Sequence, residues 1–210
     1  MFKYYLEDYC AELNGDFSTH KKNIRNFFQK NILDFTHINK HKIYIVDLLL
    51  HNKLWHELWY LTKDMCISAN INLNFSEFAH TVRFAFLEVS PGDELIPHTD
   101  TNLRSMCSIN IPLENDCAID FYESPKYKDN PKKEMYNKID TLIYTNPIIL
   151  NTNNWHGVEN FTNKSRLVLK VNFPIVPWNI MVSSINNKAV NRLFAFDMPW
   201  DENNVMEQLL

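Results

Sequence analysis

Apolar residues in the first third of the chain recur at helical spacing. One stripe is formed by Ile24, Phe27, Phe28 and Ile32, and a second by Leu50, Leu54, Trp55, Leu58 and Leu61. Intervals of three and four residues place such side chains on one face of a helix, so both stripes predict helices that pack against a core. We expect Ser18 or Thr19 to cap the first helix and the second helix to begin near Asp47.

After residue 80 the pattern changes to short β-rich segments separated by turn residues. About seven segments are predicted as strands: Thr81–Val89, Glu94–Asp100, Met106–Leu113, Ala118–Glu123, Thr141–Tyr144, Ile148–Asn151 and Arg166–Phe173. Many short strands with turns between them are typical of an antiparallel sandwich or barrel, with the helices packed outside it. The predicted fold is therefore mainly β with flanking helices, in the form of a jelly roll.

Length and composition fit one globular domain. The chain has 210 residues, and no repeat or Pro/Gly/Ser-rich linker marks a domain boundary. We divide this single domain, 1–210, into a mainly helical N-terminal support (1–80), a jelly-roll core (81–175) and a C-terminal extension (176–210). The last part of the extension, Phe194–Leu210, is expected to cover the barrel or to form a dimer contact.

Charge, hydropathy and cysteine usage narrow the class of protein. The 25 acidic and 21 basic side chains leave a net charge of -4, which disfavours nucleic acid as a partner. No apolar run approaches the ~18 residues of a membrane span, and the N-terminus lacks the apolar stretch of a signal peptide. The four cysteines contain no CxxC pair and are expected to be reduced. We therefore expect a soluble, cytoplasmic protein without a membrane partner.

Glycine is scarce, so each glycine is expected where no other residue fits. Only three occur. Two of them lie near the candidate site residues: Gly92 is in a Ser-Pro-Gly-Asp turn, and Gly157 directly follows His156. With so few glycines the chain contains neither a P-loop nor a dinucleotide-binding fingerprint. A GxSxG nucleophile elbow is absent as well, which argues against a serine hydrolase.

Two histidines and an aspartate form the candidate metal site. His98 and Asp100 stand in PHTD at the end of a predicted strand, where residues two apart share a face. His156 lies in WHGVENFTNKSRLVLKVNF, and Arg166 follows at an offset of 166 − 156 = 10 residues. Two histidines and one carboxylate with other positions open are the ligand triad of non-haem Fe(II) oxygenases. An arginine guanidinium binds a carboxylate through two parallel hydrogen bonds. A turn histidine and an unrelated capping aspartate are the structural alternative.

The segments PHTDTNLRSMCSINIPL and WHGVENFTNKSRLVLKVNF resemble the Fe(II)/2-oxoglutarate-dependent oxygenases, and the resemblance covers residues 81–175. Within that superfamily they look most like the aspartyl/asparaginyl β-hydroxylase group and its small bacterial and phage relatives. The resemblance implies a double-stranded β-helix (jelly-roll, cupin-like). It also implies that His98, Asp100 and His156 hold Fe(II), that Arg166 binds the distal carboxylate of 2-oxoglutarate, and that O2 is the oxidant.

The chain departs from this group on the strand after the His-x-Asp motif. The hydroxylase group has basic residues there that help to bind 2-oxoglutarate, whereas this chain has Ser108 and Asn110, with Arg104 a few residues earlier. Ser108 and Asn110 share a strand face, so each is a candidate donor to a carboxylate, and Arg104 is a third candidate. Ordinary polar residues at a sheet end are an equally good interpretation. The polar insert at 124–134 is predicted to be a solvated loop or a substrate lid.

These features predict a hydroxylase that oxidises an aliphatic C–H of a small molecule, such as an amino acid, and releases succinate and CO2. Retention of Asp100 favours hydroxylation, because halogenating relatives lack the carboxylate. The last strand, RLVLKVNF, lacks the second arginine typical of the nucleic-acid demethylases. Three alternatives stay open: a hydroxylase of Asp or Asn in a peptide or protein, a metal-dependent isomerase or dioxygenase that ignores 2-oxoglutarate, and a non-catalytic cupin-like binding module.

Overall fold

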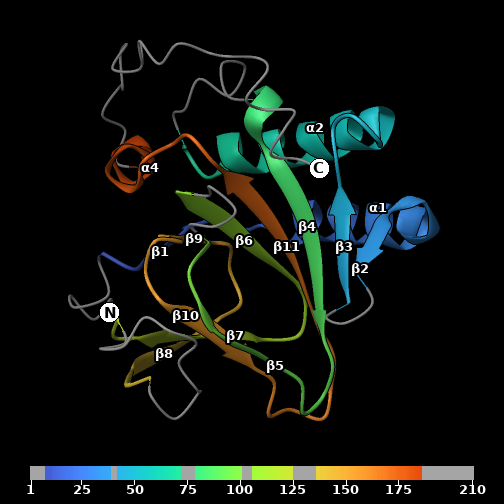
Figure 1. Cartoon of the computed structure of the whole chain (residues 1–210). Coiled ribbons are helices and arrows are strands. Elements are labelled where there is room, and N and C mark those ends of the chain that lie inside the picture. The colour runs from blue at the N-terminus through green and yellow to red at the C-terminus, as the bar shows by residue number, and fades with distance from the viewer. Residues whose placement is uncertain (1–7, 39–41, 72–78, 101–105, 125–135, 186–210) are drawn as a thin grey trace.

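Two antiparallel sheets face each other in the computed structural model, which describes residues 8–38, 42–71, 79–100, 106–124 and 136–185 (Figure 1). The larger sheet has the strand order β1 (Cys10–Glu12), β9 (Ile148–Leu150), β6 (Cys107–Glu114), β11 (Arg166–Phe173), β4 (Arg83–Val89), β3 (Ile43–Val46) and β2 (Thr36–Ile38). The smaller sheet has the order β5 (Glu94–His98), β10 (His156–Glu159), β7 (Cys117–Tyr122) and β8 (Lys138–Tyr144). This architecture confirms the predicted jelly roll.

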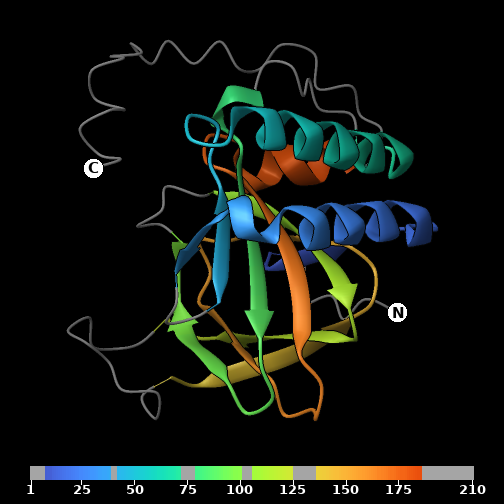
Figure 2. The same cartoon turned by 90° about the vertical axis from the view of Figure 1, so that its right-hand side faces the viewer.

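Helices cover the face of the larger sheet that points away from the smaller sheet (Figure 2). They are α1 (Ser18–Asn31), α2 (Asn52–Ser68) and α4 (Trp178–Ile185), with short 3₁₀ helices η2 (Ile32–Asp34) and η3 (Ala79–Thr81) between them in the chain. No helix in the described part of the chain has the length and hydropathy needed to cross a membrane.

The last strand, β11, contributes to two separate cores. Every second residue from Leu167 to Phe173 packs toward the helices, whereas Val168 packs between the two sheets. Successive side chains of a strand point to opposite faces, so Arg166 and Lys170 share the side of Val168. A strand that is buried on both faces reads as an almost continuous apolar run. The two cations in this run therefore lie inside the jelly roll.

Aromatic side chains join the helices to the larger sheet. Phe86 of β4 lies against Phe28 of α1, with ring centroids 4.6 Å apart, and stacks on Phe35 at 5.6 Å. Trp55 of α2 packs on Phe84 of β4 at 5.6 Å. All five rings are buried. The apolar stripes that predicted helices thus face a core, as expected.

The start of α1 corrects the predicted cap. Ser18 is the first helical residue, and no side-chain cap forms at the preceding position. Instead, Asp16 Oδ1 accepts the backbone N–H of Ser18 at 2.9 Å. The Ser18 and Thr19 hydroxyls are already inside the first turn, so a carboxylate two residues upstream reaches the free N–H in their place.

The start of α2 is displaced from the predicted position near Asp47 to Asn52. The Asp47 carboxylate accepts the backbone N–H groups of Leu49 at 2.8 Å and Leu50 at 3.2 Å. These bonds hold a separate turn ahead of the helix. Aspartate favours such turns because its side chain bonds the backbone two residues further on.

The N-terminal third also supplies three strands that the apolar pattern did not predict. β1 pairs with β9, placing Cys10 opposite Leu150. β2 and β3 form a hairpin whose second strand pairs with β4. Each of these strands has only 3 or 4 residues, too few for an alternating pattern to stand out. They extend the larger sheet at both edges.

Two predicted features lie largely outside the described residues. The insert at 124–134 is described only at Ser124, and the segment Phe194–Leu210 is not described. After residue 175 the described chain forms α4, whose Met181 is buried in the core beneath the helices.

Phe86 provides a test of the helix–sheet core. Its ring is fully buried among the rings of Phe28 and Phe35, so Phe86→Ala leaves a cavity that the rigid sheet cannot close. We expect the free energy of unfolding in urea to fall by about 3–5 kcal/mol. Phe161→Ala is the matched control, because Phe161 is 77% exposed. Its effect should stay within about 0.5 kcal/mol, and equal losses in both variants would contradict this core.

Candidate metal centre

Neighbouring strands of the smaller sheet place two histidines side by side. β5 ends at His98 and β10 begins at His156, and the antiparallel register of these strands sets the two residues opposite each other. Their ring centroids are 4.5 Å apart. Strand pairing therefore unites two residues that are distant in the sequence.

Gly157 allows this pairing to be close. A Cβ atom at this position would lie 2.9 Å from the Leu95 carbonyl oxygen and 3.3 Å from Tyr122 Cε2. The register also shifts between His156 and Val158, where β5 has one residue more than β10, so that the β-bulge lies on β5. The turn glycine Gly92 is needed for a different reason, since its φ of +79° lies in the left-handed region. Both glycines meet the expectation drawn from their scarcity.

Asp100 lies beyond the end of β5, so the prediction that Asp100 and His98 share a strand face is wrong. Two other contacts aim its carboxylate. Its backbone N–H donates to the Thr152 carbonyl at 3.0 Å, which ties it to the turn before β10. Its side chain forms an ion pair with Lys170 of β11. The position of Asp100 therefore depends on the turn between β9 and β10 and on β11 of the larger sheet.

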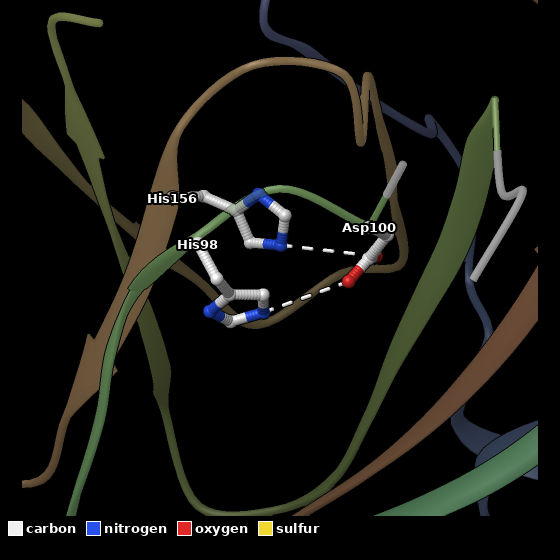
Figure 3. Close-up of side chains that lie close together, drawn as sticks. All are labelled: His98, Asp100 and His156. Carbon is white, nitrogen blue, oxygen red and sulfur yellow. Dashed lines mark ion pairs between the residues drawn. The ribbon is translucent and has the colours of Figure 1, made fainter. Parts of the chain in front are cut away.

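The three side chains converge on one point (Figure 3). His98 Nε2 lies 3.5 Å from Asp100 Oδ1, and His156 Nε2 lies 3.8 Å from Asp100 Oδ2. One ligand atom from each residue lies within 4.8 Å of the others, the one such group among the described residues. These separations are too long for hydrogen bonds. They suit atoms that each sit about 2.0–2.2 Å from one shared ion.

A backbone carbonyl orients each imidazole. Nδ1 of His98 lies 2.8 Å from the Ile96 carbonyl oxygen, and Nδ1 of His156 lies 2.8 Å from that of Asn154. Because a carbonyl oxygen can only accept, Nδ1 carries the proton in both rings and Nε2 presents its lone pair. His156 Nε2 is buried without a hydrogen-bond partner. Metal-ligating histidines are held in this way, and a shared ion would satisfy the orphaned nitrogen.

Electrostatics keep these groups in the protonation states that metals require. Burial lowers the pKa of His156 to about 3, and burial also lowers the pKa of His98. Burial alone would raise the pKa of Asp100, but the charge of Lys170 and other nearby groups outweighs it, and the pKa falls below its ordinary value. Both imidazoles are therefore neutral and the carboxylate is ionised near pH 7.

Access to the group is one-sided. The side chains of Asp100 and His156 are each only 3% exposed, whereas that of His98 is 38% exposed. Solvent and ligands therefore reach the three residues from the side of His98.

Arg166, the first residue of β11, is buried between the sheets. Its Nη1 donates to the Glu159 carbonyl at 3.0 Å, while its Nε is buried without a hydrogen-bond partner. An unsatisfied buried donor is unusual in a folded protein. The guanidinium thus retains hydrogen-bonding capacity for an anion inside the jelly roll.

Ser108 and Asn110 lie on the inner face of β6 and bond to each other. The Ser108 hydroxyl donates to Asn110 Oδ1 at 3.0 Å, which confirms that the two side chains share a face. Asn110 also hydrogen-bonds Tyr144, whose pKa is raised by burial. Arg104 lies outside the described residues. A role for Ser108, Asn110 or Arg104 in binding a cofactor stays a prediction.

Sequence reasoning assigned no role to two polar side chains that the fold brings inside. Lys170 contacts Asp100, and Tyr144 contacts Asn110. A signal existed for Lys170, since its even spacing from Arg166 places it on the same face of β11. Nothing in the sequence around Tyr144 distinguished its phenol from a core side chain.

Comparison with known proteins identifies the fold. No protein-family model matches the chain, and no curated protein matches it. Two solved structures from nogalamycin biosynthesis are similar, and both proteins are described as non-haem α-ketoglutarate-dependent enzymes. The epimerase SnoN is 11% identical with a TM-score of 0.51, over 80% of this chain and 76% of SnoN. The carbocyclase SnoK is 10% identical with a TM-score of 0.53, over 82% of this chain and 83% of SnoK. SnoN is also known in complex with Fe³⁺ and α-ketoglutarate (2-oxoglutarate). At such low identities the similarity establishes the double-stranded β-helix fold.

Gly157→Ala tests the close pairing of β5 and β10. The added Cβ would meet the Leu95 carbonyl, so the strands must separate and carry His156 away from His98. We expect a loss of stability of about 1–3 kcal/mol in urea denaturation. We also expect Mn(II) affinity, measured by titration calorimetry, to weaken by about tenfold or more.

The control for Gly157→Ala is Gly92→Ala, which introduces backbone strain at a φ of +79° but meets no atom within 4 Å. It should lower stability without changing Mn(II) affinity. An equal loss of Mn(II) affinity in both variants would contradict the role given to Gly157.

Proposed function

We propose that the chain is a non-haem Fe(II)- and 2-oxoglutarate-dependent dioxygenase that hydroxylates an aliphatic C–H of a small molecule, such as an amino acid. The observation that carries the proposal is the convergence of His98, Asp100 and His156 inside a jelly roll, with both Nε2 atoms aimed at the carboxylate. This donor set is that of the non-haem Fe(II) oxygenases. When bound, iron and 2-oxoglutarate supply the oxidation of a C–H bond by O2, with release of succinate and CO2.

The donor set favours a reactive ion over a structural zinc. Structural zinc sites are closed by four ligands that are mostly cysteine and histidine. Here three ligands converge among the described residues, and none of the four buried, free cysteines belongs to the group. The exposed side at His98 leaves room for other ligands of the ion. Imidazole and carboxylate together suit iron.

Arg166 supports the assignment of a dicarboxylate co-substrate. Its guanidinium is buried between the sheets, and its Nε lacks a partner. An arginine in such a place binds a planar carboxylate through parallel charged hydrogen bonds. We assign it the distal carboxylate of 2-oxoglutarate. Ser108, Asn110 and Tyr144 add neutral hydrogen-bonding groups on the inner face of the sheets.

The chain's own residues would prepare the reaction by orientation and by exclusion of water. The carbonyls of Ile96 and Asn154 fix both rings, so the ligand nitrogens need no reorientation when the ion binds. Burial of Asp100 and His156 shields two sides of the ion, and the substrate would approach past His98. Shielding from water limits the side reactions of an oxidising centre.

The substrate class and the reaction outcome are the finer parts of the proposal. The resemblance to the aspartyl/asparaginyl β-hydroxylase group and the retained Asp100 support hydroxylation. SnoN and SnoK are an epimerase and a carbocyclase, so related folds serve other outcomes. Product mass separates these outcomes, because hydroxylation adds one oxygen atom and epimerisation leaves the mass unchanged.

The buried, free cysteines support a cytoplasmic location.

An anaerobic titration of the metal-free protein with Fe(II) and 2-oxoglutarate tests the function. We expect a visible charge-transfer band of the chelated keto acid that requires both additions. The band should be lost in His156→Ala, because one of three ligands is removed. It should persist in His56→Ala, which removes an exposed histidine of α2. Iron binding without the band would point to a metal enzyme that ignores 2-oxoglutarate, and no iron binding would point to a binding module.

Arg166→Ala tests the binding of the co-substrate separately from that of the metal. A charged hydrogen bond contributes about 1.5–3 kcal/mol, so 2-oxoglutarate affinity at the Mn(II)-loaded protein should fall by about 10- to 100-fold. Mn(II) affinity in the absence of 2-oxoglutarate should stay close to that of the wild type, since Arg166 is not a ligand. Arg83→Ala on the neighbouring strand β4 is the control, because Arg83 is exposed. Unchanged 2-oxoglutarate affinity in Arg166→Ala would place the anion elsewhere.

A further inference from the structure

We propose that Lys170 is a counter-ion built into the metal centre. When no metal is bound, Lys170 neutralises Asp100 and competes with the metal for that carboxylate. When the metal binds, Lys170 is released and pairs with the metal-bound carboxylate of 2-oxoglutarate, while Arg166 keeps the distal one. This inference rests on the proposed function and adds to it a residue that couples the binding of the metal to the binding of the co-substrate.

The position of Lys170 makes it a competitor of the ion. Its ammonium pairs with Asp100 Oδ2, and the same oxygen faces His156 Nε2 at 3.8 Å. A metal that binds Asp100 through Oδ2, the oxygen nearest His156 Nε2, would therefore meet the ammonium there. A divalent ion and an ammonium on one oxygen repel each other, and the repulsion is strong where water screens it weakly. Metal binding at this oxygen thus favours movement of the lysine away from it.

Burial makes this exchange energetically significant. The Lys170 side chain is 11% exposed and that of Asp100 is 3% exposed, so water screens the pair weakly. A buried carboxylate without a partner is strongly disfavoured, and the ammonium removes that penalty in the metal-free protein. Once a divalent ion takes the carboxylate, the ammonium is left buried, unpaired and next to a like charge. Lys170 therefore stabilises the metal-free state and weakens metal binding.

The strands beside Lys170 offer it no replacement for Asp100. In the larger sheet Lys170 lies opposite Asn110 of β6 and Ala85 of β4, neither of which carries a charge. Arg166 lies four residues earlier on β11, about 13 Å along the strand, so it does not substitute for Lys170 at Asp100. An incoming carboxylate bound at the metal supplies the missing negative charge. The metal and 2-oxoglutarate then favour each other's binding, and this coupling is reciprocal.

Mn(II) titration of Lys170→Met tests the competition, because methionine keeps most of the side-chain length without the charge. We expect the variant to bind Mn(II) about 10- to 100-fold more tightly than the wild type in the absence of 2-oxoglutarate. We also expect the metal-free variant to melt at a lower temperature, because Asp100 has lost its partner. Unchanged or weaker Mn(II) binding would overturn the proposal. A residue that served only the packing of the sheet would not raise metal affinity.

Lys138→Met is the matched control. Lys138 pairs with Asp120 at 2.8 Å on the smaller sheet, so this variant also removes a lysine from an aspartate pair. Asp120 is not in the metal group, and Mn(II) affinity should not change. Tightening of equal size in both variants would mean that net charge alone sets metal affinity, and would overturn the role of Lys170.

A second titration, with 2-oxoglutarate present, tests the coupling. 2-oxoglutarate should tighten Mn(II) binding by a larger factor in the wild type than in Lys170→Met, because only the wild type has an ammonium to receive the carboxylate. An equal or larger factor in the variant would overturn the release of Lys170 to 2-oxoglutarate.

If Lys170→Met fails to fold when no metal is present, Mn(II) should restore the folded state, because the ion replaces the ammonium at Asp100. Failure of Mn(II) to restore the folded state would overturn the proposal. The wild type separates this inference from the proposed function. If the wild type binds no Mn(II), the metal centre itself is wrong. If the wild type binds Mn(II) and shows the keto-acid band while Lys170→Met matches its affinity, only the role of Lys170 is wrong.

Discussion

The backbones of β5 and β10 approach each other at Gly157 more closely than a residue with a Cβ atom allows. This approach fixes the register that sets His98 opposite His156. The carbonyl that orients His98 belongs to Ile96 of β5, and the carbonyl that orients His156 belongs to Asn154, in the turn before β10. The spacing of the two histidines therefore depends on the close contact between these backbones, and the aspartate is brought to them from outside the strand pair.

The two faces of the larger sheet have different roles: the outer face stabilises the fold, and the inner face carries polar residues of the candidate site. On the outer face, aromatic and aliphatic side chains of β4, β6 and β11 bury against α1 and α2. That core allows the inner face to hold Arg166, Lys170 and Asn110, which are costly to bury. Polar groups inside a barrel need a scaffold that does not depend on them. Here the helix-side core is that scaffold.

The spacing of apolar residues predicted those helices and strands whose positions are determined by burial of their side chains. The bounds of β11 agree with the prediction because both of its faces are buried, and the two long helices follow from their apolar stripes. The spacing of apolar residues did not predict the positions of residues that are held by single polar contacts. Asp100 owes its position to Thr152 and Lys170, which lie far from it in the sequence. β10 was not predicted as a strand, because it has only 4 residues and one of them is Gly157.

The position of His98 on β5 affects how long a bound ion stays. β5 is an edge strand among the described strands of the smaller sheet, paired only with β10, whereas β10 is held on both sides. Edge strands open more readily than central ones, through local fluctuations that leave the rest of the fold intact. Fraying of β5 would detach one imidazole while His156 keeps its place. The residence time of the ion would then follow the rate at which this edge opens, and amide hydrogen exchange along β5 would slow when the ion is bound.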